Sequence, residues 1–187
     1  MSAKTIFGEL YVGPGETVEY PDVEGVRGLV NVQDEATLIC PRLKYASGGI
    51  RVWYRGTLIA PKLAHVGDLF HIALETTLDV PSLAHVAALV VPRGVPLYAP
   101  LLAGAERLYI GNGVTVELPS LKWVGQLYLD DEGDLEAVSL EKIGQEPISG
   151  TMARRVKRRY ITHRATVPHA RCTATCVEPV SDEEKCR

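Results

Sequence analysis

The sequence predicts an all-β fold: a parallel β-solenoid of about seven 19–20-residue coils, with a C-terminal extension. Three observations support this. A pattern of apolar-x-apolar-Pro-x-Leu recurs, its copies are 19 or 20 residues apart, and apolar residues alternate before each proline. The marker prolines are Pro21, Pro41, Pro61, Pro81, Pro100 and Pro119, and Val138 holds this slot in a last, degenerate copy.

Each copy is expected to hold two short strands. The residues three and one before the proline are apolar while the residue between them varies, as in Leu78-Asp79-Val80. This period of two is typical of a strand with one buried face, which the proline ends. A second alternating pair follows at nine and eleven residues after the proline in the longer copies, and at eight and ten in the shorter ones. The change in repeat length therefore falls in the corner between the two strands.

The composition indicates an aliphatic core and no membrane span. Hydrophobic residues make up 46% of the 187 residues and aromatic residues only 6%. No apolar run approaches the length of about 18 residues that a transmembrane helix needs. The N-terminus lacks the apolar stretch of a signal peptide, and three of the four cysteines are close to the C-terminus. We therefore expect a cytoplasmic protein.

The charge distribution divides the chain near Gly150. Residues 1–150 carry 11 Lys and Arg against 19 Asp and Glu, a net charge of −8, whereas residues 151–187 carry a net charge of +5. We expect an N-terminal cap over 1–16, the repeat solenoid over 17–144, and a basic, Cys-containing extension over 145–187. This extension is interpreted as a cap, a dimerisation element or a disordered segment.

The string LPSLKWVGQLYLDDEGDLEAVSLEKIG resembles the leucine-rich repeats of receptor-L-domain type, in which L-P-x-L-x-x-V-G-x-L-x-I recurs. The likeness covers about 17–144 and rests on scaffold positions. It implies a right-handed solenoid of a kind seen in bacterial surface proteins and in bacteriophage proteins. Because a fold does not determine a function, it assigns no catalytic residue.

Two outward stripes are expected, since equivalent positions of successive coils stack. The first-strand stripe lies four residues after the proline and reads Gly25, Tyr45, His65, His85, Gly104, Trp123 and Lys142. The second-strand stripe reads Asn31, Arg51, His71, Val90, Tyr109 and Tyr128. Arg, Trp and Tyr favour interface hot spots. The predicted partner-binding residues are Arg51, Trp53, Tyr54, His71, Tyr109 and Tyr128.

Other chemistry is weakly indicated. His65 and His85 lie one coil apart, but no carboxylate or thiol joins them, which favours two solvated histidines. The extension contains one weak candidate for a zinc site, but its H-x5-H-x2-C-x3-C spacing fits no common zinc finger. Free thiols are therefore the favoured interpretation of these cysteines, and a disulfide bond between them is the other alternative. This candidate comprises His163, His169, Cys172 and Cys176.

We expect a non-enzymatic, cofactor-free solenoid that binds a protein. One interpretation adds that it forms a homodimer. By analogy with the resembling proteins, it is a phage or mobile-element inhibitor or adaptor acting on a host protein. Two alternatives stay open: a self-assembling structural protein, and nucleic-acid binding through the basic tail 151–171. The phosphate-contacting residues would then be Arg154, Arg155, Lys157, Arg158 and Arg159.

Overall fold

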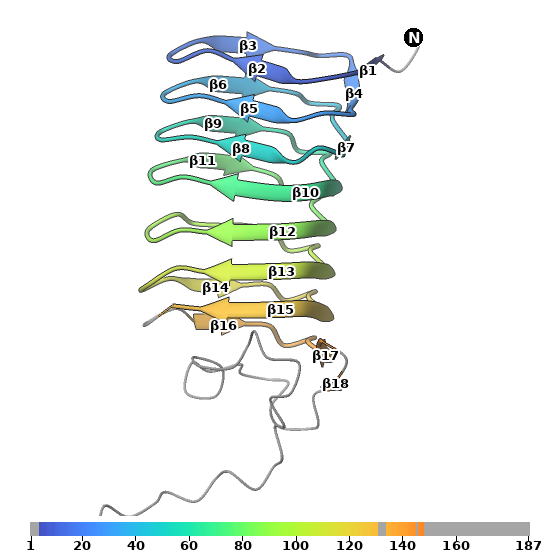
Figure 1. The fold of residues 1–187 in the computed structure, drawn as a ribbon, viewed down its shortest axis with the longest axis vertical. Helices are drawn as coiled ribbons and strands as arrows, with labels where there is room; N and C mark the ends of the chain where they lie inside the picture. Colours follow the sequence, from blue (N-terminus) through green and yellow to red (C-terminus); the bar gives the residue numbers. More distant parts are fainter. Residues whose placement is uncertain (1–3, 131–133, 145, 148–187) are drawn as a thin grey trace, which may run out of the picture.

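The computed structural model describes residues 4–130, 134–144 and 146–147. Within these ranges all helices and strands are of one kind: the elements are the β-strands β1 to β18. The chain winds in a right-handed sense, and successive turns stack into one elongated column (Figure 1). The predicted all-β parallel solenoid of about seven coils is therefore confirmed.

Each of the first three coils contributes three short strands. They are β1 (Lys4–Ile6), β2 (Leu10–Val12) and β3 (Thr17–Glu19) in coil 1, β4 (Val23–Val26), β5 (Val30–Val32) and β6 (Thr37–Ile39) in coil 2, and β7 (Tyr45–Ala46), β8 (Ile50–Val52) and β9 (Thr57–Ile59) in coil 3. Alternation sets the inward face of a strand: in β8, Ile50 and Val52 are buried while Arg51 is exposed.

From coil 4 onward the first two strands of each coil merge into one longer strand. The strands of coils 4 to 7 are β10 (His65–Ile72), β11 (Thr77–Asp79), β12 (His85–Val91), β13 (Gly104–Ile110), β14 (Thr115–Glu117), β15 (Trp123–Leu129) and β16 (Asp134–Glu136). The register between β10 and β12 shifts between Val66 and Leu69, at the corner of the coil. A short antiparallel pair, β17 (Lys142–Ile143) and β18 (Glu146–Pro147), follows coil 7.

One expected strand is absent. Residues 95–99, which precede Pro100 in coil 5, form no strand. The expectation of two strands in every copy is therefore wrong at this coil, and also in the first three coils, which have three strands each. Pro96 occupies the position that Thr77 holds in coil 4 and Thr115 holds in coil 6. Since proline has no N–H to donate to a ladder, the strand is interrupted here.

The marker prolines occupy the second position of a β-turn. Across Pro61, the Leu63 N–H donates to the Ala60 carbonyl at 2.9 Å. Proline fixes φ near the value that this position requires. The same bond recurs from Leu43 to Cys40, Leu83 to Val80, Leu102 to Ala99, Leu121 to Leu118 and Leu140 to Ala137. The turn directs the leucine two residues after the proline into the core.

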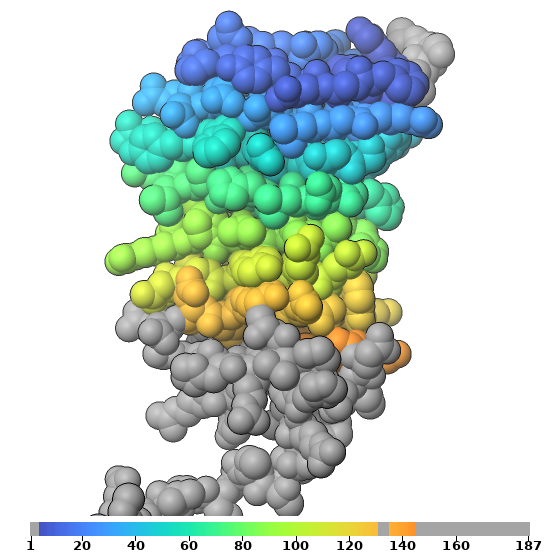
Figure 2. Space-filling view, viewed as in Figure 1, coloured from blue at the N-terminus to red at the C-terminus, as the bar shows by residue number. Residues whose placement is uncertain are grey.

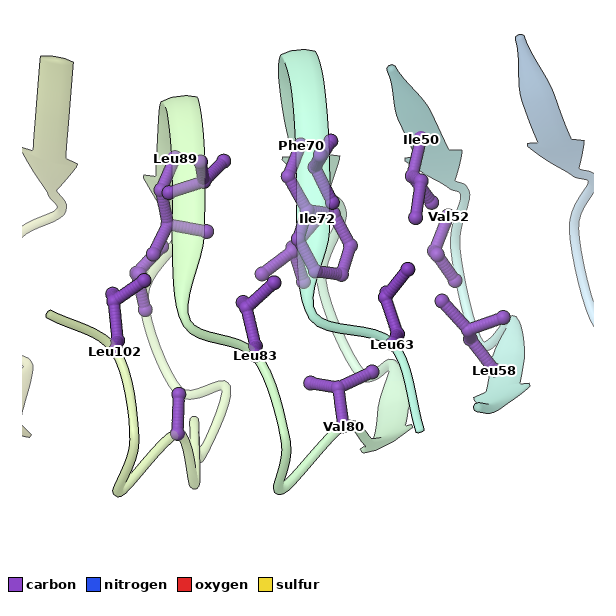
Figure 3. Packing of buried hydrophobic residues seen from close by; sticks show 14 of the residues in the cluster. Ile50, Val52, Leu58, Leu63, Phe70, Ile72, Val80, Leu83, Leu89 and Leu102 are labelled. Atoms are coloured by element: carbon purple, nitrogen blue, oxygen red, sulfur yellow. The ribbon is translucent and has the colours of Figure 1, made fainter. Parts of the chain in front are cut away.

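These leucines form a ladder along the inside of the column. Leu43, Leu63, Leu83, Leu102 and Leu121 are fully buried, and Leu140 is 1% exposed. Figure 3 shows Leu63, Leu83 and Leu102 side by side, with Phe70 of β10 above them. Each fully buried leucine contributes about 1.5–3 kcal/mol relative to an exposed one. The core is thus continuous from coil to coil.

Residues 4–16, in the segment expected to cap the N-terminus, lie in coil 1. Here β2 pairs in parallel with β5, with Leu10 opposite Val30, and β3 pairs with β6, with Thr17 opposite Thr37. Leu10 and Val12 are buried, so coil 1 forms this end of the core. The other edge of coil 1 pairs with no strand in the described part of the chain.

A second set of turns follows the second strand in coils 1 to 3 and the long strand in coils 4 to 6. In coil 2, the Ala36 N–H donates to the Gln33 carbonyl at 3.1 Å and Glu35 has a φ of 59°. A positive φ at the third residue is typical of a type II turn, which favours Gly because a Cβ there costs about 1–2 kcal/mol. The equivalent residues are Gly15 (69°), Glu35 (59°), Arg55 (55°), Glu75 (58°), Gly94 (72°) and Gly113 (70°).

Candidate functional site

The second-strand stripe runs the length of the column. Parallel register aligns its members one per coil, and Tyr11 of β2 extends the stripe by one coil; the aligned residues are Tyr11, Asn31, Arg51, His71, Val90, Tyr109 and Tyr128. With about 4.8 Å between coils, the stripe is about 29 Å long. Figure 2 shows the face that carries it, on which the coils form one continuous stacked surface.

Trp53 lies across this stripe and contacts the coils on both sides of its own. Its indole Nε1 donates to Asn31 Oδ1 at 2.9 Å, and its ring centroid lies 5.6 Å from that of His71. Asn31 is itself fixed, since its Nδ2 donates to Glu9 at 2.8 Å and its Oδ1 also accepts from Gln33 at 2.9 Å. Trp53, which is 37% exposed, therefore has its indole held in place without a partner.

His71 is a half-buried polar residue of the stripe. Its Nδ1 is buried and has no hydrogen-bond partner among the described residues. Burial, and secondarily the positive charge of Arg51, hold the pKa of His71 below its usual value of 6.5. The imidazole is consequently neutral at neutral pH and acts as an aromatic neighbour of Trp53.

Tyr54 and Arg55 lie at the next corner of coil 3. The Tyr54 hydroxyl donates to Glu75 Oε1 at 3.1 Å, and Arg55 Nε donates to Glu75 Oε2 at 2.8 Å. Arg55 also contacts Glu35 on the other side, at 3.5 Å, and its guanidinium carbon lies 4.8 Å from the centre of the Tyr54 ring. The hydrogen bond from Arg55 lowers the pKa of Glu75, so its carboxylate stays ionised. We call Glu35, Arg55 and Glu75 the corner ladder.

Tyr109 and Tyr128 form a second aromatic cluster on the stripe. Their rings are stacked with centroids 4.2 Å apart and planes inclined by 6°, and the Tyr128 hydroxyl donates to Gln126 at 3.1 Å. Beside them is an open hollow of about 440 Å³. Its lining includes Val90, Pro92, Arg93, Asn112 and Asp130. Stacking limits the rotation of the two rings, and both tyrosines are half-buried.

The first-strand stripe is also aligned, from Thr5 in coil 1 to Lys142 after coil 7. The Tyr45 ring lies over Gly25, where a Cβ would approach Tyr45 Cζ to 2.1 Å. Glycine there lets the tyrosine reach back to Thr5, and the two hydroxyls are 3.2 Å apart. In coil 6, Gly104 accommodates a ring of the next coil in the same way.

The histidines of the first-strand stripe are neighbours, as the repeat predicts. The His65 and His85 rings are stacked with centroids 6.4 Å apart, and the Trp123 ring lies 6.2 Å from His85. Within the described ranges no three His, Cys, Asp or Glu residues gather as a metal site would require. The geometry there favours ring packing between coils.

The structure groups the predicted site residues into two clusters, on the face of the second-strand stripe and, for Tyr54, at the adjacent corner. Four of them lie in coils 3 and 4 and two in coils 6 and 7, with Val90 between; the first cluster contains Arg51, Trp53, Tyr54 and His71, and the second Tyr109 and Tyr128. The corner ladder was not predicted. Its only sequence signal is that Gly15, Gly94 and Gly113 mark the same turn position in other coils.

The tail residues fall outside the described part of the chain. This applies to the proposed phosphate contacts Arg154, Arg155, Lys157, Arg158 and Arg159, and to the zinc candidates His163, His169, Cys172 and Cys176. Those expectations remain predictions.

The fold and the outward stripes define a parallel β-solenoid repeat protein. No family model, curated protein or solved structure gives a significant match to the chain. The described residues contain no helix with the length and apolar character that crossing a bilayer requires.

Proposed function

We propose that the protein is a non-enzymatic binding module that takes a protein partner on the face of the second-strand stripe. The observation that supports this most directly is the fixed position of Trp53, whose indole is hydrogen-bonded to Asn31 yet partly exposed. A side chain that is ordered before binding loses little conformational entropy when the partner arrives. Trp and Tyr anchors of this kind dominate interface energies.

The dimensions of the face suit such a partner. A stripe about 29 Å long, flanked by the corner residues of each coil, is comparable to one side of a standard interface, which covers about 800 Å². The two aromatic clusters provide anchors at the middle of the stripe and at its C-terminal end, and the hollow beside Tyr109 and Tyr128 provides room for an inserted side chain. Buried aromatic anchors within a polar rim are the usual anatomy of an interface.

A narrower form of this proposal follows the resemblance of the repeat to receptor-L-domain leucine-rich repeats. In that form the protein is a cytoplasmic inhibitor or adaptor of phage or mobile-element origin that blocks or recruits a host protein. A rigid solenoid suits this role because it presents a preformed surface.

The double variant Y109A/Y128A tests the proposal. The full-length protein is immobilised, and partners captured from native cells are identified by mass spectrometry and then purified for affinity measurements. We expect Y109A/Y128A to weaken binding by at least about a hundredfold, since hot-spot truncations cost about 2 kcal/mol or more each.

The matched control is Y98A/L101A, which removes two exposed apolar side chains outside the stripe. This control should bind as the wild type does, and the far-UV circular dichroism of both variants should be unchanged. Wild-type affinity in Y109A/Y128A would reject the second-strand face as the binding site.

Nucleic-acid binding through the tail is the second candidate. It is favoured by seven Lys and Arg residues and no Asp or Glu over 151–171. Phosphate contacts release counterions, so affinity for DNA or RNA should fall steeply with salt concentration. Deletion of 151–187 should then abolish binding, and an absence of binding in the full-length protein would reject this candidate.

A further inference from the structure

We propose that two copies of this chain associate head to head through coil 1, with β2 of one copy paired antiparallel to β2 of the other. Coil 1 lies at one end of the column (Figure 1), and the outer side of its strands pairs with no strand in the described part of the chain. We call this outer side of β1, β2 and β3 the open edge. The inference goes beyond the proposed function, because it concerns another surface and does not depend on the second-strand face.

The open edge of β2 presents unpaired backbone groups. The Leu10 N–H donates to the Leu29 carbonyl of coil 2 at 2.8 Å. The Val12 carbonyl accepts from the Gln33 N–H, also of coil 2, at 3.1 Å. Successive residues of a strand direct their N–H and C=O groups to opposite sides, so the groups of Tyr11 point away from coil 2. Such an edge is a template on which another strand can form a ladder.

The open edge of β3 has the same property at other residues. The Glu16 carbonyl accepts from coil 2 at 2.7 Å, and the Tyr20 N–H donates to coil 2 at 2.8 Å. By the same alternation Val18 faces coil 2, whereas Thr17 and Glu19 direct their N–H and C=O groups outward. Both sides of coil 1 therefore offer donors and acceptors to a further strand.

A single twofold axis passes through the middle of both strands. A turn joins β2 to β3, and in it the Glu16 N–H donates to the Gly13 carbonyl at 3.1 Å. Tyr11 lies two residues before this turn and Val18 two residues after it. An axis that passes through Tyr11 perpendicular to the column therefore also passes near Val18.

Antiparallel pairing about this axis uses the unpaired groups on both strands. Tyr11 faces Tyr11 of the second copy, and Thr17 faces Glu19 of the second copy, each as a pair that exchanges both N–H···O bonds. The Glu19 carboxylates of the two copies are not opposite each other. A twofold interface must be complementary to itself, and the alternation of β2 and β3 meets this condition. This agreement favours a second copy over an unrelated strand.

The side chains of coil 1 fit the same arrangement. Tyr11 is 54% exposed and would lie beside its own counterpart, as aromatic cross-strand pairs do. On the inward side, Leu10 faces Val12 of the second copy, so the two cores become continuous. Phe7, which is 74% exposed, lies four residues before Tyr11, and Gly15 lies four residues after it. The axis thus brings Phe7 toward Gly15 of the second copy, where nothing lies within 4 Å of a Cβ.

The opposite end of the column does not offer an equivalent edge at β17. There β17 pairs with the antiparallel strand β18, whose Pro147 has no N–H to donate. A strand of coil 1 therefore cannot add in parallel to β17, and association stops at two copies. The dimer carries both second-strand stripes on one face, as a continuous row about 62 Å long. A partner with two equivalent sites could then bind both copies at once.

The variant Y11P tests the proposal by sedimentation equilibrium of the full-length protein over a wide concentration range. We expect the wild type to be a dimer. In Y11P the Kd for dimerisation should rise at least about a hundredfold, since proline removes the central N–H and its ring occupies the space of the second copy. The far-UV circular dichroism of Y11P should be unchanged, because this N–H has no partner within one copy. The matched control Y11V keeps the N–H, and its Kd should stay within about tenfold of the wild-type value.

A cross-link tests the register. In a C172S/C176S/C186S background, mild oxidation should join two copies of Y11C, because facing residues have Cα atoms about 5.5 Å apart, within the range of a disulfide. R51C, on the same stripe, should not cross-link, since its two copies would be about 24 Å apart. If Y11P does not fold, the two cysteine variants decide.

Four outcomes would overturn the proposal: a monomer at all concentrations, a polymer that grows with concentration, a dimer that folded Y11P leaves intact, or failure of Y11C to cross-link more than R51C. The first outcome would leave the open edge to a strand of another protein. The third would place the dimer contact elsewhere on the chain.

Discussion

The indole of Trp53 and the amide of Asn31, one coil apart, are joined by a hydrogen bond of 2.9 Å from Nε1 to Oδ1. The Asn31 Nδ2 group donates a hydrogen bond to Glu9, so Asn31 links three successive coils. The side chain with the largest ring on this face is thus fixed by its neighbours.

Replacing Asn31 with Ala should free the indole. In a W123F background Trp53 is the only tryptophan, so fluorescence reports on it alone. We expect a red-shifted emission, a lower anisotropy and a loss of about 1 kcal/mol in the free energy of unfolding, the usual net contribution of a hydrogen bond. The control N112A changes an asparagine of coil 6 and should leave the emission unchanged. Unaltered anisotropy in N31A would show that the hydrogen bond does not fix the ring.

The lowered pKa of His71 makes stability depend on pH. Protonation of the His71 imidazole is less favourable in the folded protein than in the unfolded chain. The contribution of the neutral imidazole to the free energy of unfolding is therefore complete above the ordinary pKa of 6.5, and it is lost as pH falls through the lowered pKa of the folded protein. Val90 is the equivalent residue of the next coil, so H71V is the matched variant. Urea denaturation at pH 7.5 and 5 should show a larger loss of stability in the wild type than in H71V. Equal losses would contradict the prediction.

Cys40 should resist alkylation. Burial raises the pKa of its thiol to about 12, and only the thiolate is the nucleophile. In a variant in which Cys172, Cys176 and Cys186 are changed to Ser, iodoacetamide at pH 8 should leave the folded protein unmodified and should alkylate it fully in denaturant. Mass spectrometry measures both. Rapid alkylation without denaturant would show that the strand before Pro41 opens readily.

The same raised pKa has a consequence at alkaline pH. Because the folded thiol ionises only near 12, this contribution to stability is complete below the ordinary pKa of 9.0 and is lost as pH rises toward 12. Replacement of Cys40 by Ala should remove this part of the alkaline destabilisation. The C40A variant should otherwise fold normally, since alanine occupies the equivalent positions 60 and 99.

Gly28 should be the least replaceable glycine of the first corner. A Cβ there would lie 2.1 Å from the carbonyl oxygen of Gly8, a backbone atom that cannot move aside without shifting coil 1. We expect G28A to lower the free energy of unfolding by about 3 kcal/mol. At Gly15 nothing lies within 4 Å of a Cβ, so G15A should cost only the backbone strain of its positive φ, about 1–2 kcal/mol. Equal costs in the two variants would contradict the close backbone contact between coils 1 and 2.

The proline spacing predicts the scaffold and both stripes because parallel stacking converts sequence period directly into spatial alignment. Tyr109 and Tyr128, 19 residues apart, are therefore foreseeable neighbours. The reach of Trp53 to Asn31 and His71 is not foreseeable, since a rotamer depends on side chains in other coils. Pro96 is the sequence signal for the missing strand in coil 5, but the apolar alternation around it is undisturbed.

The corner ladder escaped prediction for a different reason. Glu35, Arg55 and Glu75 resemble ordinary solvated charges, and only the backbone shows that they stand where glycine is preferred. Local preference at these turns was overridden by the stacking of coils, in which the Glu35 and Arg55 N–H groups donate to the carbonyls of Tyr54 and Leu74. A sequence pattern predicts the periodic part of a fold more readily than it predicts non-glycine residues at positive φ.

The even spacing of the coils determines which secondary structure of a partner can contact successive coils with equivalent side chains. Side chains on one face of an extended partner strand repeat about every 6.8 Å, so they lose step with coils about 4.8 Å apart almost at once. A partner helix repeats about every 5.4 Å and drifts only about 0.6 Å per coil. An aligned helix thus stays in step for two or three coils, the extent of each aromatic cluster, and a longer partner must meet the two clusters with separate elements.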